Sequence, residues 1–363
     1  MREPLLVVEN LHVHFHTYAG IAQVVHGGNL HIDRGEMVAV VGETGCGKSV
    51  TSKAILGLLP GPARIVHGDI RFRGRSVLNL SPAEWQQVRG AGISMVFQDP
   101  MTALNPVFTV GEQLVDVVLW QGKPRVGLGG YFRRRFNRRE MAEAREKAIE
   151  MLRKVRIPDP ARTIDRYPVE LSGGMRQRVL IALALINQPE LIIADEPGTA
   201  LDVSIQDQVL NLMKELAREQ GTAVLLITHN LGVARQVCDR IYVMYAGGVV
   251  ETATTRQVFQ RQYHPYTQGL LHSIPKLTGE MGEGIEGRIP DYVHPPRGCR
   301  FYDRCPVRMD VCRDTPPPVA VLDGDHRVAC HLYAPGAAAV GALTAKSADQ
   351  AGEPGAAAGG RTA

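Results

Sequence analysis

A glycine-rich segment that ends in a lysine and a serine has the residue types and spacing of a site for phosphate chemistry. The segment Gly42-Glu43-Thr44-Gly45-Cys46-Gly47-Lys48-Ser49 follows the apolar run 37–41 and precedes residues 50–59, which are compatible with a helix. Glycines let the backbone turn its N–H groups toward an anion, and a helix N-terminus adds unpaired donors and a positive dipole end. Lys48 would supply a point charge and Ser49 a metal ligand. The segment is therefore predicted to be a phosphate-binding loop, with Val50 as a further contact.

Two neighbouring carboxylates form a second candidate site. Asp195 and Glu196 follow the apolar run 191–194, and the C-terminal end of a buried parallel strand is where open parallel sheets bind ligands. Asp195 suits Mg²⁺, directly or through water, and Glu196 suits a hydrolytic water. Acidic residues after a strand are also common in turns, but the phosphate-binding loop upstream favours the chemical interpretation.

An octapeptide in the middle of the chain resembles the signature motif of the ATP-binding cassette family. It reads Leu171-Ser172-Gly173-Gly174-Met175-Arg176-Gln177-Arg178 and places a serine and glycines at a helix N-terminus, which is again an anion site. The resemblance implies that this helix completes the nucleotide site of an opposite subunit, so that two cassettes enclose two ATP molecules head to tail. The expected contacts are Ser172, Gly173, Gly174 and Gln177.

Further positions match the motifs of the same family. One departure is Gly198, where the family more often has Thr or Ser. The resemblance implies a Q-loop glutamine that touches metal and water, a Walker B aspartate on the metal, a general base, a D-loop and a switch histidine that senses the γ-phosphate. These are Gln98, Asp195, Glu196, Asp202 within Ala200-Leu201-Asp202, and His229.

Two segments narrow the resemblance to the dipeptide, oligopeptide and nickel importer branch. They are residues 98–106 (Gln-Asp-Pro-Met-Thr-Ala-Leu-Asn-Pro) and a C-terminal pattern made of residues 264–271 and 273–275. The resemblance covers about residues 5–275. It implies an ATP-hydrolysing subunit that acts with a second ABC ATPase subunit, two transmembrane permease subunits and, indirectly, an extracytoplasmic solute-binding protein. The Q-loop region would dock on the cytoplasmic helices of the permease.

An aromatic side chain near the loop could stack on adenine. Residues 5–15 and 22–32 alternate enough to form antiparallel strands joined by a turn at 17–20. Phe15 is the first candidate and Tyr18 the second. Ordinary strand packing or a turn explains either residue equally well.

Four of the six cysteines, Cys299, Cys305, Cys312 and Cys330, crowd the C-terminal region. A disulfide pair is disfavoured in a chain expected to be cytoplasmic. Four thiolates suit zinc, which His326 and His331 could join, or an iron–sulfur cluster, and the spacing alone does not choose between them. The stretch from Gly298 to Pro306 looks like the tail of dipeptide-importer ATPases, which implies a [4Fe–4S] cluster. Unliganded thiols are the third interpretation, and Cys46 and Cys238 are interpreted as small buried residues.

The composition of the chain argues against three other classes of protein: nucleic-acid-binding, membrane-spanning and secreted proteins. A net charge of +4 over 363 residues is too small to indicate nucleic acid, and no apolar stretch is long enough for a membrane span. The start of the chain lacks the apolar run of a secretory signal. We therefore expect a soluble, cytoplasmic chain, and the resemblance to importer ATPases implies that it sits at the cytoplasmic face of the membrane. The basic segment 123–139 is interpreted as a solvated loop or a contact with anionic lipid headgroups, with nucleic acid as the weaker alternative.

Strands and helices alternate as a parallel sheet requires. The expected elements are a helix at 172–186, a strand at 191–194, a helix at 202–218 and strands at 223–228 and 240–246. We predict an α/β P-loop NTPase core of the ABC ATPase type with an antiparallel β edge. The predicted division is an ATPase domain at 1–260 with a helical subdomain inserted at about 100–168, a small irregular Cys-rich extension at 261–333, and a disordered Ala/Gly-rich tail at 334–363.

Two other functions are alternatives to transport: a cassette ATPase without a transporter, and a sensor that regulates the ATPase. A cassette ATPase without a transporter could act in DNA repair, translation or iron–sulfur assembly, but the short distance from Gly42 to Leu171 leaves no room for a long coiled coil, and one cassette is present. In the other class the cysteine-rich extension is a redox or metal sensor that regulates the ATPase.

Overall fold

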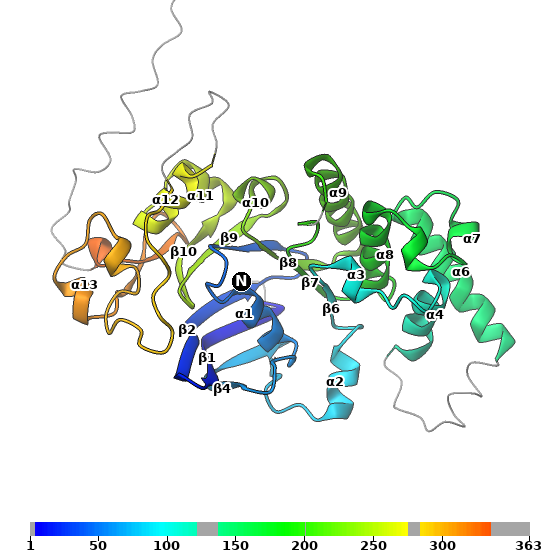
Figure 1. Cartoon of the computed structure of the whole chain (residues 1–363), viewed down its shortest axis with the longest axis horizontal. Helices are drawn as coiled ribbons and strands as arrows, with labels where there is room; N and C mark the ends of the chain where they lie inside the picture. The colour runs from blue at the N-terminus through cyan, green and yellow to red at the C-terminus, as the bar shows by residue number, and fades with distance from the viewer. Residues whose placement is uncertain (1–3, 122–136, 200, 275–283, 335–363) are drawn as a thin grey trace, which may run out of the picture.

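A computed structural model describes residues 4–121, 137–199, 201–274 and 284–334 (Figure 1). The predicted tail beyond residue 334, Ala200 of the predicted D-loop and most of the basic segment 123–139 lie outside the described residues. The described chain is built on two β-sheets, with a set of helices at one end and the cysteine-rich extension at the other (Figure 1).

The main sheet has eight strands, and five adjacent ones are parallel. The central strands are fully buried and almost wholly apolar, as expected for parallel strands covered on both faces. In spatial order the strands are β11 (Val319–Val321), β12 (Arg327–Ala329), β10 (Gly248–Thr254), β9 (Arg240–Tyr245), β3 (Met37–Val41), β8 (Ala223–Thr228), β7 (Leu191–Asp195) and β6 (Ile93–Val96).

The second sheet is antiparallel, which confirms the predicted β edge. Its order is β2 (Gly20–Ile32), β1 (Leu6–Thr17), β4 (Ala63–Phe72) and β5 (Arg75–Ser76). The strands β4 and β5 were missed from the sequence. A core between the two sheets also includes Ile55 at the end of helix α1 (Lys48–Ile55). Helix α1 is therefore held firmly behind the glycine-rich loop.

Helices cover the other face of the main sheet. Helix α8 (Gly173–Leu185) contributes seven buried residues, and α9 (Val203–Gln220) contributes six. With α10 (Leu231–Val237) they belong to the larger hydrophobic core. The predicted α/β core, with helices packed on a largely parallel sheet, is thus confirmed.

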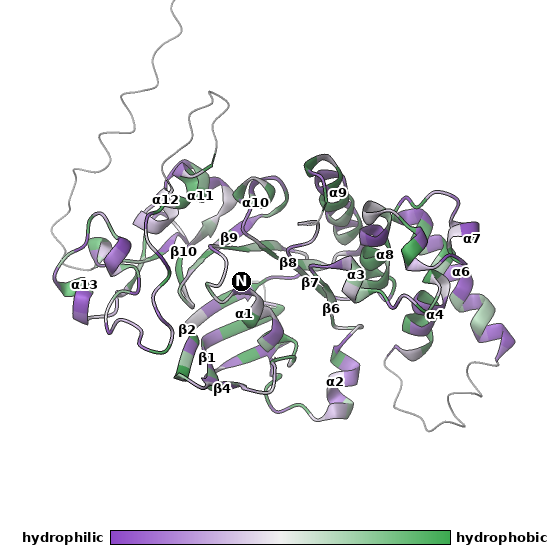
Figure 2. Cartoon of the chain, viewed as in Figure 1, coloured by the Kyte–Doolittle hydropathy of each residue, from purple (hydrophilic) through white to green (hydrophobic). Residues whose placement is uncertain are grey.

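Between β6 and β7, the described chain also forms the short helices α3 (Pro100–Ala103) and α7 (Pro160–Thr163), the longer α4 (Val110–Trp120) and α6 (Arg138–Lys154), and the 3-10 turn η1 (Pro168–Glu170). Helix α6 is mostly hydrophilic in colour (Figure 2), and its buried positions are spaced to form one face. It packs on α4 through that face. No helix within the described ranges is both long and apolar enough to cross a bilayer.

The extension is more regular than the sequence suggested. It contains α12 (Pro265–His272) and α13 (Val311–Asp314), the 3-10 turns η2 (Tyr302–Arg304) and η3 (His331–Tyr333), and the hairpin β11–β12, all after α11 (Thr255–Gln260). Strand β12 pairs with β10, with Glu251 opposite Val328. The expectation of a small irregular module is corrected on this point, because the hairpin adds two strands to the main sheet.

Candidate functional site

The glycine-rich loop lies between β3 and α1, and close packing dictates its glycines. A Cβ atom on Gly42 would lie 2.1 Å from the carbonyl oxygen of Met244. Gly47 precedes the first residue of α1 with a φ of 106°, a conformation that favours glycine. The loop therefore joins the strand to the helix by a path that only small residues at these positions allow, and it leaves the first N–H groups of α1 without a side-chain cap.

Lys48 folds back over the loop. Its Nζ donates to the carbonyl oxygens of Gly42, at 2.8 Å, and Glu43, at 2.9 Å. The residue is 5% exposed, so its charge is held inside the loop. Cys46 is fully buried beside it, and burial raises the pKa of the Cys46 thiol. An ammonium group satisfied by carbonyl oxygens in this way could exchange them for phosphate oxygens with little movement of the chain.

Ser49 and Asp195 meet at the C-terminal edge of the sheet. The Ser49 hydroxyl donates to Asp195 Oδ1 at 3.0 Å, although 146 residues separate them in the sequence. Burial raises the pKa of Asp195, while the hydrogen bond from Ser49 opposes that shift. A hydroxyl beside a carboxylate is the type of hard oxygen pair that Mg²⁺ prefers.

Glu196 is held between two side chains from other loops. Gln98 Nε2 lies 3.3 Å from Glu196 Oε2, and His229 Nδ1 lies 3.2 Å from Glu196 Oε1. Glu196 has a φ of 47°, an uncommon value for a residue with a side chain, and its N–H donates to the Ile227 carbonyl. The structure thus brings together three of the residues that the sequence proposed for catalysis.

The signature segment lies well away from the glycine-rich loop of the same chain. Figure 1 shows α8 across the sheet from α1. Ser172 caps α8 by accepting the Met175 N–H at 3.3 Å, and Ser172 and Gly173 are exposed. Gly174 packs closely, since a Cβ atom there would lie 2.9 Å from Ile205. The N-terminus of α8 is therefore accessible to a ligand. A ligand bound to the loop at 42–49 of the same chain would lie too far away to contact it.

The other residues proposed to contact the nucleotide range from fully buried to exposed. Gln177 is fully buried in α8, and its amide atoms have no hydrogen-bond partner among the described residues. The prediction that Gln177 contacts a ligand is therefore not supported, because its side chain does not reach the surface. Phe15 is half-buried on β1 and packs on the core between the sheets, whereas Tyr18 is fully exposed at the hairpin turn. Asp202 is exposed at the start of α9, and Val50 is half-buried in α1.

The four C-terminal cysteines surround one small pocket. Cys299, Cys305, Cys312 and Cys330 all line it, together with apolar neighbours such as Phe301, Val307 and Met309. All four are free thiols. Burial raises the pKa of Cys299 to about 11 and that of Cys330 to about 12, and the neighbouring cysteines add to both shifts. The fold has therefore gathered four thiols in one pocket, and at Cys299 and Cys330 burial favours the protonated form.

The described residues contain no group of three or more His, Cys, Asp or Glu side chains placed to hold a single metal ion. The two histidines proposed as zinc ligands have other partners. His326 Nε2 lies 2.7 Å from Glu251 Oε1 in a buried pair, and His331 Nε2 lies 3.0 Å from the Thr315 carbonyl oxygen. The suggestion that His326 joins a zinc site is corrected accordingly.

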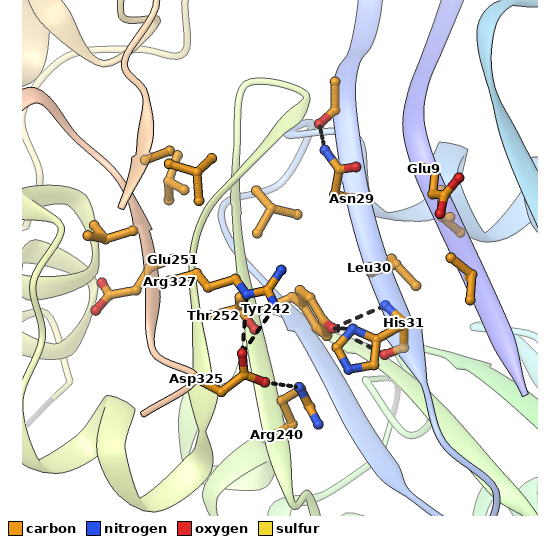
Figure 3. Close-up of a pocket in the computed structure, with 18 residues that line it drawn as sticks. Glu9, Asn29, Leu30, His31, Arg240, Tyr242, Glu251, Thr252, Asp325 and Arg327 are labelled. Atoms are coloured by element: carbon orange, nitrogen blue, oxygen red, sulfur yellow. Dashed lines mark hydrogen bonds and ion pairs between the residues drawn. The ribbon is translucent and has the colours of Figure 1, made fainter. Parts of the chain in front are cut away.

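A cavity of about 460 Å³ lies away from these residues, between the antiparallel sheet and the β11–β12 hairpin (Figure 3). Arg240 and Arg327 both pair with Asp325 there, and the Tyr242 hydroxyl lies 3.2 Å from His31 Nδ1. None of residues 42–49 lines this cavity. Arg240 also pairs with Glu36 at 2.8 Å, so both arginines have carboxylate partners, and the cavity lies along the seam between the sheet and the extension.

The fold and the loop at 42–49 define a P-loop nucleotide-binding protein of the α/β class. Comparison with known proteins narrows this class. The family described as "ABC transporter" matches residues 25–199, and the family described as "Oligopeptide/dipeptide transporter, C-terminal region" matches residues 250–312. The chain belongs to the family of ABC transporter ATP-binding proteins.

Relatives match along most of their length. The dipeptide transport ATP-binding protein DppD of Bacillus subtilis is 47% identical over 91% of this chain and 95% of its own. The oligopeptide transport ATP-binding protein OppD of the same organism is 44% identical over 92% of this chain and 90% of its own. The probable D,D-dipeptide transport ATP-binding protein DdpD of Escherichia coli is 44% identical over 91% and 97%, respectively.

Solved cassette structures share the fold. A dimeric ATP-binding cassette in a post-hydrolysis state, bound to ADP and Pi, gives a TM-score of 0.58 at 28% identity and covers 69% of this chain and 99% of that one. A nucleotide-free ATP-binding cassette from an ABC transporter gives the same TM-score at 25% identity and covers 74% and 99%.

Proposed function

We propose that this chain is the ATP-binding and ATP-hydrolysing subunit of a membrane importer of dipeptides or oligopeptides. The observation that carries the proposal is the convergence of Ser49, Asp195, Glu196 and His229 at the edge of the sheet next to the phosphate-binding loop. Relatives that are named as peptide transport ATP-binding proteins, and are more than 40% identical, support the peptide class.

In the proposed reaction, the loop at 42–49 binds the ATP phosphates. Lys48 releases its bonds to the Gly42 and Glu43 carbonyl oxygens and donates to phosphate oxygens instead. Backbone N–H groups at the start of α1 supply further donors. The glycines at 42, 45 and 47 let the backbone approach the phosphates closely.

Ser49 and Asp195 are the residues that would hold Mg²⁺, directly or through water, with Gln98 as a further oxygen donor. These two residues fit Mg²⁺ because both offer hard oxygen ligands, and their oxygens already lie 3.0 Å apart in a hydrogen bond. When bound, Mg²⁺ neutralises phosphate charge. Asp195 would have to be ionised in that role, and positive charge beside it would oppose the effect of burial on its pKa.

Glu196 is proposed as the general base that takes a proton from the attacking water. Gln98 and His229 hold its carboxylate from two sides, so that one oxygen can face the water. His229 would then report on the γ-phosphate through the same contact. Thr199 also donates to the Glu196 carbonyl oxygen at 2.9 Å, which holds the turn that carries the base.

The second half of the nucleotide site is proposed to come from another ABC ATPase subunit. The exposed N-terminus of α8, with Ser172 and Gly173, is far from the loop of its own chain (Figure 1). A related cassette has been solved as a dimer bound to ADP and Pi. The proposal uses Ser172, Gly173, Gly174 and the exposed Asp202, but not the buried Gln177. Phe15 is retained as the adenine-stacking residue, because it is only half-buried.

The proposed docking site for two transmembrane permease subunits is the segment that follows Gln98. Met101, Val107 and Phe108 expose 57%, 71% and 45% of their surface, which is unusual for apolar side chains so close together in sequence. Closure of two cassettes on ATP would move this segment and thereby the permease. The chain would sit at the cytoplasmic face of the membrane, with an extracytoplasmic solute-binding protein as an indirect partner and no nucleic acid.

The cysteine pocket is proposed to hold a [4Fe–4S] cluster. The four thiols share one apolar pocket, and Cys299, Cys305, Cys312 and Cys330 would hold the cluster through their thiolates. A bound cluster supplies positive iron, which stabilises the thiolate form of cysteines that burial otherwise keeps protonated.

The test of the transport function uses the whole assembly. The chain is purified from membranes under anaerobic conditions, and its co-purifying subunits are identified. We expect permease proteins and a second cassette, together with ATP hydrolysis that peptide-loaded binding protein stimulates. A fully active isolated monomer, or co-purification with nucleic-acid or iron–sulfur assembly proteins, would favour a cassette ATPase without a transporter.

The test of the cluster uses the absorbance and iron content of the same preparation. Visible absorbance and about four irons per chain are expected for the wild type, and both should be lost in a Cys305→Ser and Cys312→Ser double variant. Zinc in place of iron would support the alternative ligand. Lost regulation with intact folding and ATPase activity would support a sensing role.

A further inference from the structure

The C-terminal extension reaches into the phosphate-binding loop. The Tyr266 hydroxyl accepts the Glu43 N–H at 2.9 Å, and the Tyr292 hydroxyl donates to the Gly45 carbonyl oxygen at 2.7 Å. Arg304 Nη1 lies 3.0 Å from Glu43 Oε2. Three side chains that follow the cassette in sequence therefore fix the backbone and the charge of residues 43–45.

The Arg304 guanidinium is held in place from several sides. Its side chain is 5% exposed, against 29% for that of Glu43. It donates to the carbonyl oxygens of Glu286, at 2.8 Å, and Ile285, at 3.0 Å, and lies 5.7 Å from the centre of the Tyr245 ring. A cation fixed in this way differs from a mobile surface charge, because little side-chain entropy opposes its ion pair.

Glu43 is an unfavourable residue for a loop that binds a polyphosphate. Its carboxylate carries the same sign of charge as the ligand, and like charges at a partly buried site repel more strongly than they do in bulk water. We propose that Arg304 is a positioning residue for ATP binding, which neutralises Glu43 while Tyr266 and Tyr292 hold the loop backbone open for the phosphates. This inference rests on the proposed function, since it takes the loop at 42–49 to be the ATP site.

The segment that carries Arg304 also lines the cysteine pocket. Cys299, Phe301 and Cys305 contribute to that pocket. The Phe301 ring packs 5.1 Å from Tyr245 and 5.5 Å from Tyr266, measured between ring centres. Arg304 thus lies in a short segment that contacts the phosphate-binding loop through Glu43 and lines the cysteine pocket through Cys299 and Cys305.

A double-mutant cycle on the full-length chain tests the role of Arg304. The dissociation constant of MgATP is measured for the wild type, Arg304→Gln, Glu43→Gln and the double variant. We expect Arg304→Gln to weaken binding about tenfold, equivalent to about 1.4 kcal/mol. The double variant should recover most of that loss, since the unpaired carboxylate is gone. Arg304→Lys should fall between the wild type and Arg304→Gln, because it keeps the charge but not the fork geometry.

Recovery in the double variant separates this role from a loss of folding. A variant that merely damaged the extension would not regain affinity when Glu43 is also changed. Arg297→Gln is the matched control, because Arg297 is an exposed arginine of the same extension. The dissociation constant of MgATP for Arg297→Gln should stay within about twofold of the wild-type value. Tyr292→Phe should weaken binding about two- to tenfold through its lost hydrogen bond.

Two results would overturn the inference: Arg304→Gln binding MgATP as tightly as the wild type, or a double variant as weak as Arg304→Gln. Lys48→Ala distinguishes these failures from a failure of the proposed function. If the wild type and Lys48→Ala bind MgATP equally, the loop is not the ATP site. If only Lys48→Ala is weak, the site stands and the role of Arg304 does not.

Discussion

His229 Nδ1 lies 3.2 Å from Glu196 Oε1, which joins the ends of two adjacent parallel strands through their side chains. The histidine is half exposed, with 51% of its side chain accessible, whereas the glutamate is 14% exposed. The proposed base is therefore more sheltered than the proposed sensor, which faces solvent. In the proposed mechanism, a ligand that contacts His229 would act on Glu196 through this contact.

Replacing Glu196 with Gln should remove the proposed general base and leave the phosphate-binding loop intact. We expect ATP turnover in the assembled complex to fall by about 10²–10⁴, with MgATP binding retained. Phosphate release and nucleotide titration measure the two effects separately. Unchanged turnover in Glu196→Gln would contradict the assignment of the base.

Replacing His229 with Ala should leave the Glu196 carboxylate held on one side only. Turnover should fall by about 10², because the base loses its orientation and the γ-phosphate its sensor. His294→Ala is the control, since His294 is 82% exposed and lies in the extension. The assignment fails if the two variants hydrolyse ATP at the same rate.

Replacing Gly42 with Ala tests the packing that sets the loop. The added Cβ would lie 2.1 Å from the Met244 carbonyl oxygen, so β9 or the loop must shift. We expect a loss of about 1–3 kcal/mol in the free energy of unfolding. Gly61→Ala is the matched control, because a Cβ there meets no described atom within 4 Å. Equal denaturation midpoints for the two variants would show that the loop is more adaptable than its packing suggests.

His264 makes the stability of the extension depend on pH. Burial lowers the pKa of His264 from 6.5 to about 4, although the charge of Glu251 opposes the shift. Its Nδ1 accepts the Tyr266 N–H at 3.0 Å, which requires the neutral ring. Between about pH 6.5 and 4, His264 therefore binds a proton in the unfolded chain but not in the folded state. Its stabilising contribution is complete above about pH 6.5 and is lost as the pH falls toward 4, up to roughly 3 kcal/mol.

A His264→Asn variant isolates this effect. Asparagine keeps an acceptor at the N-terminus of α12 and does not titrate. Thermal midpoints of both proteins between about pH 7.5 and 4.5 should show a steeper fall for the wild type. Other histidines with lowered pKa values, such as His26, are common to both chains and cancel. Parallel curves would mean that His264 is not the titrating group.

Much of the site could be predicted because its signals are local. The loop at 42–49, the carboxylates at 195–196 and the signature segment at 171–178 each depend on a few consecutive residues between a strand and a helix. The capping boxes at Ser81 and Thr109 depend in the same way on residues three positions apart. Short-range geometry of this kind is written in residue types and spacing.

The tertiary structure alone decided the relations between distant segments. Arg304 contacts Glu43 across 261 residues, and β12 pairs with β10, because the extension folds back on the cassette. The burial of Gln177 depends on helix packing, which a signature motif does not encode. The sequence by itself determined the family, the phosphate-binding loop and the catalytic candidates. Packing free energy summed over the whole chain decided which of them meet and which side chains outside the motifs support them.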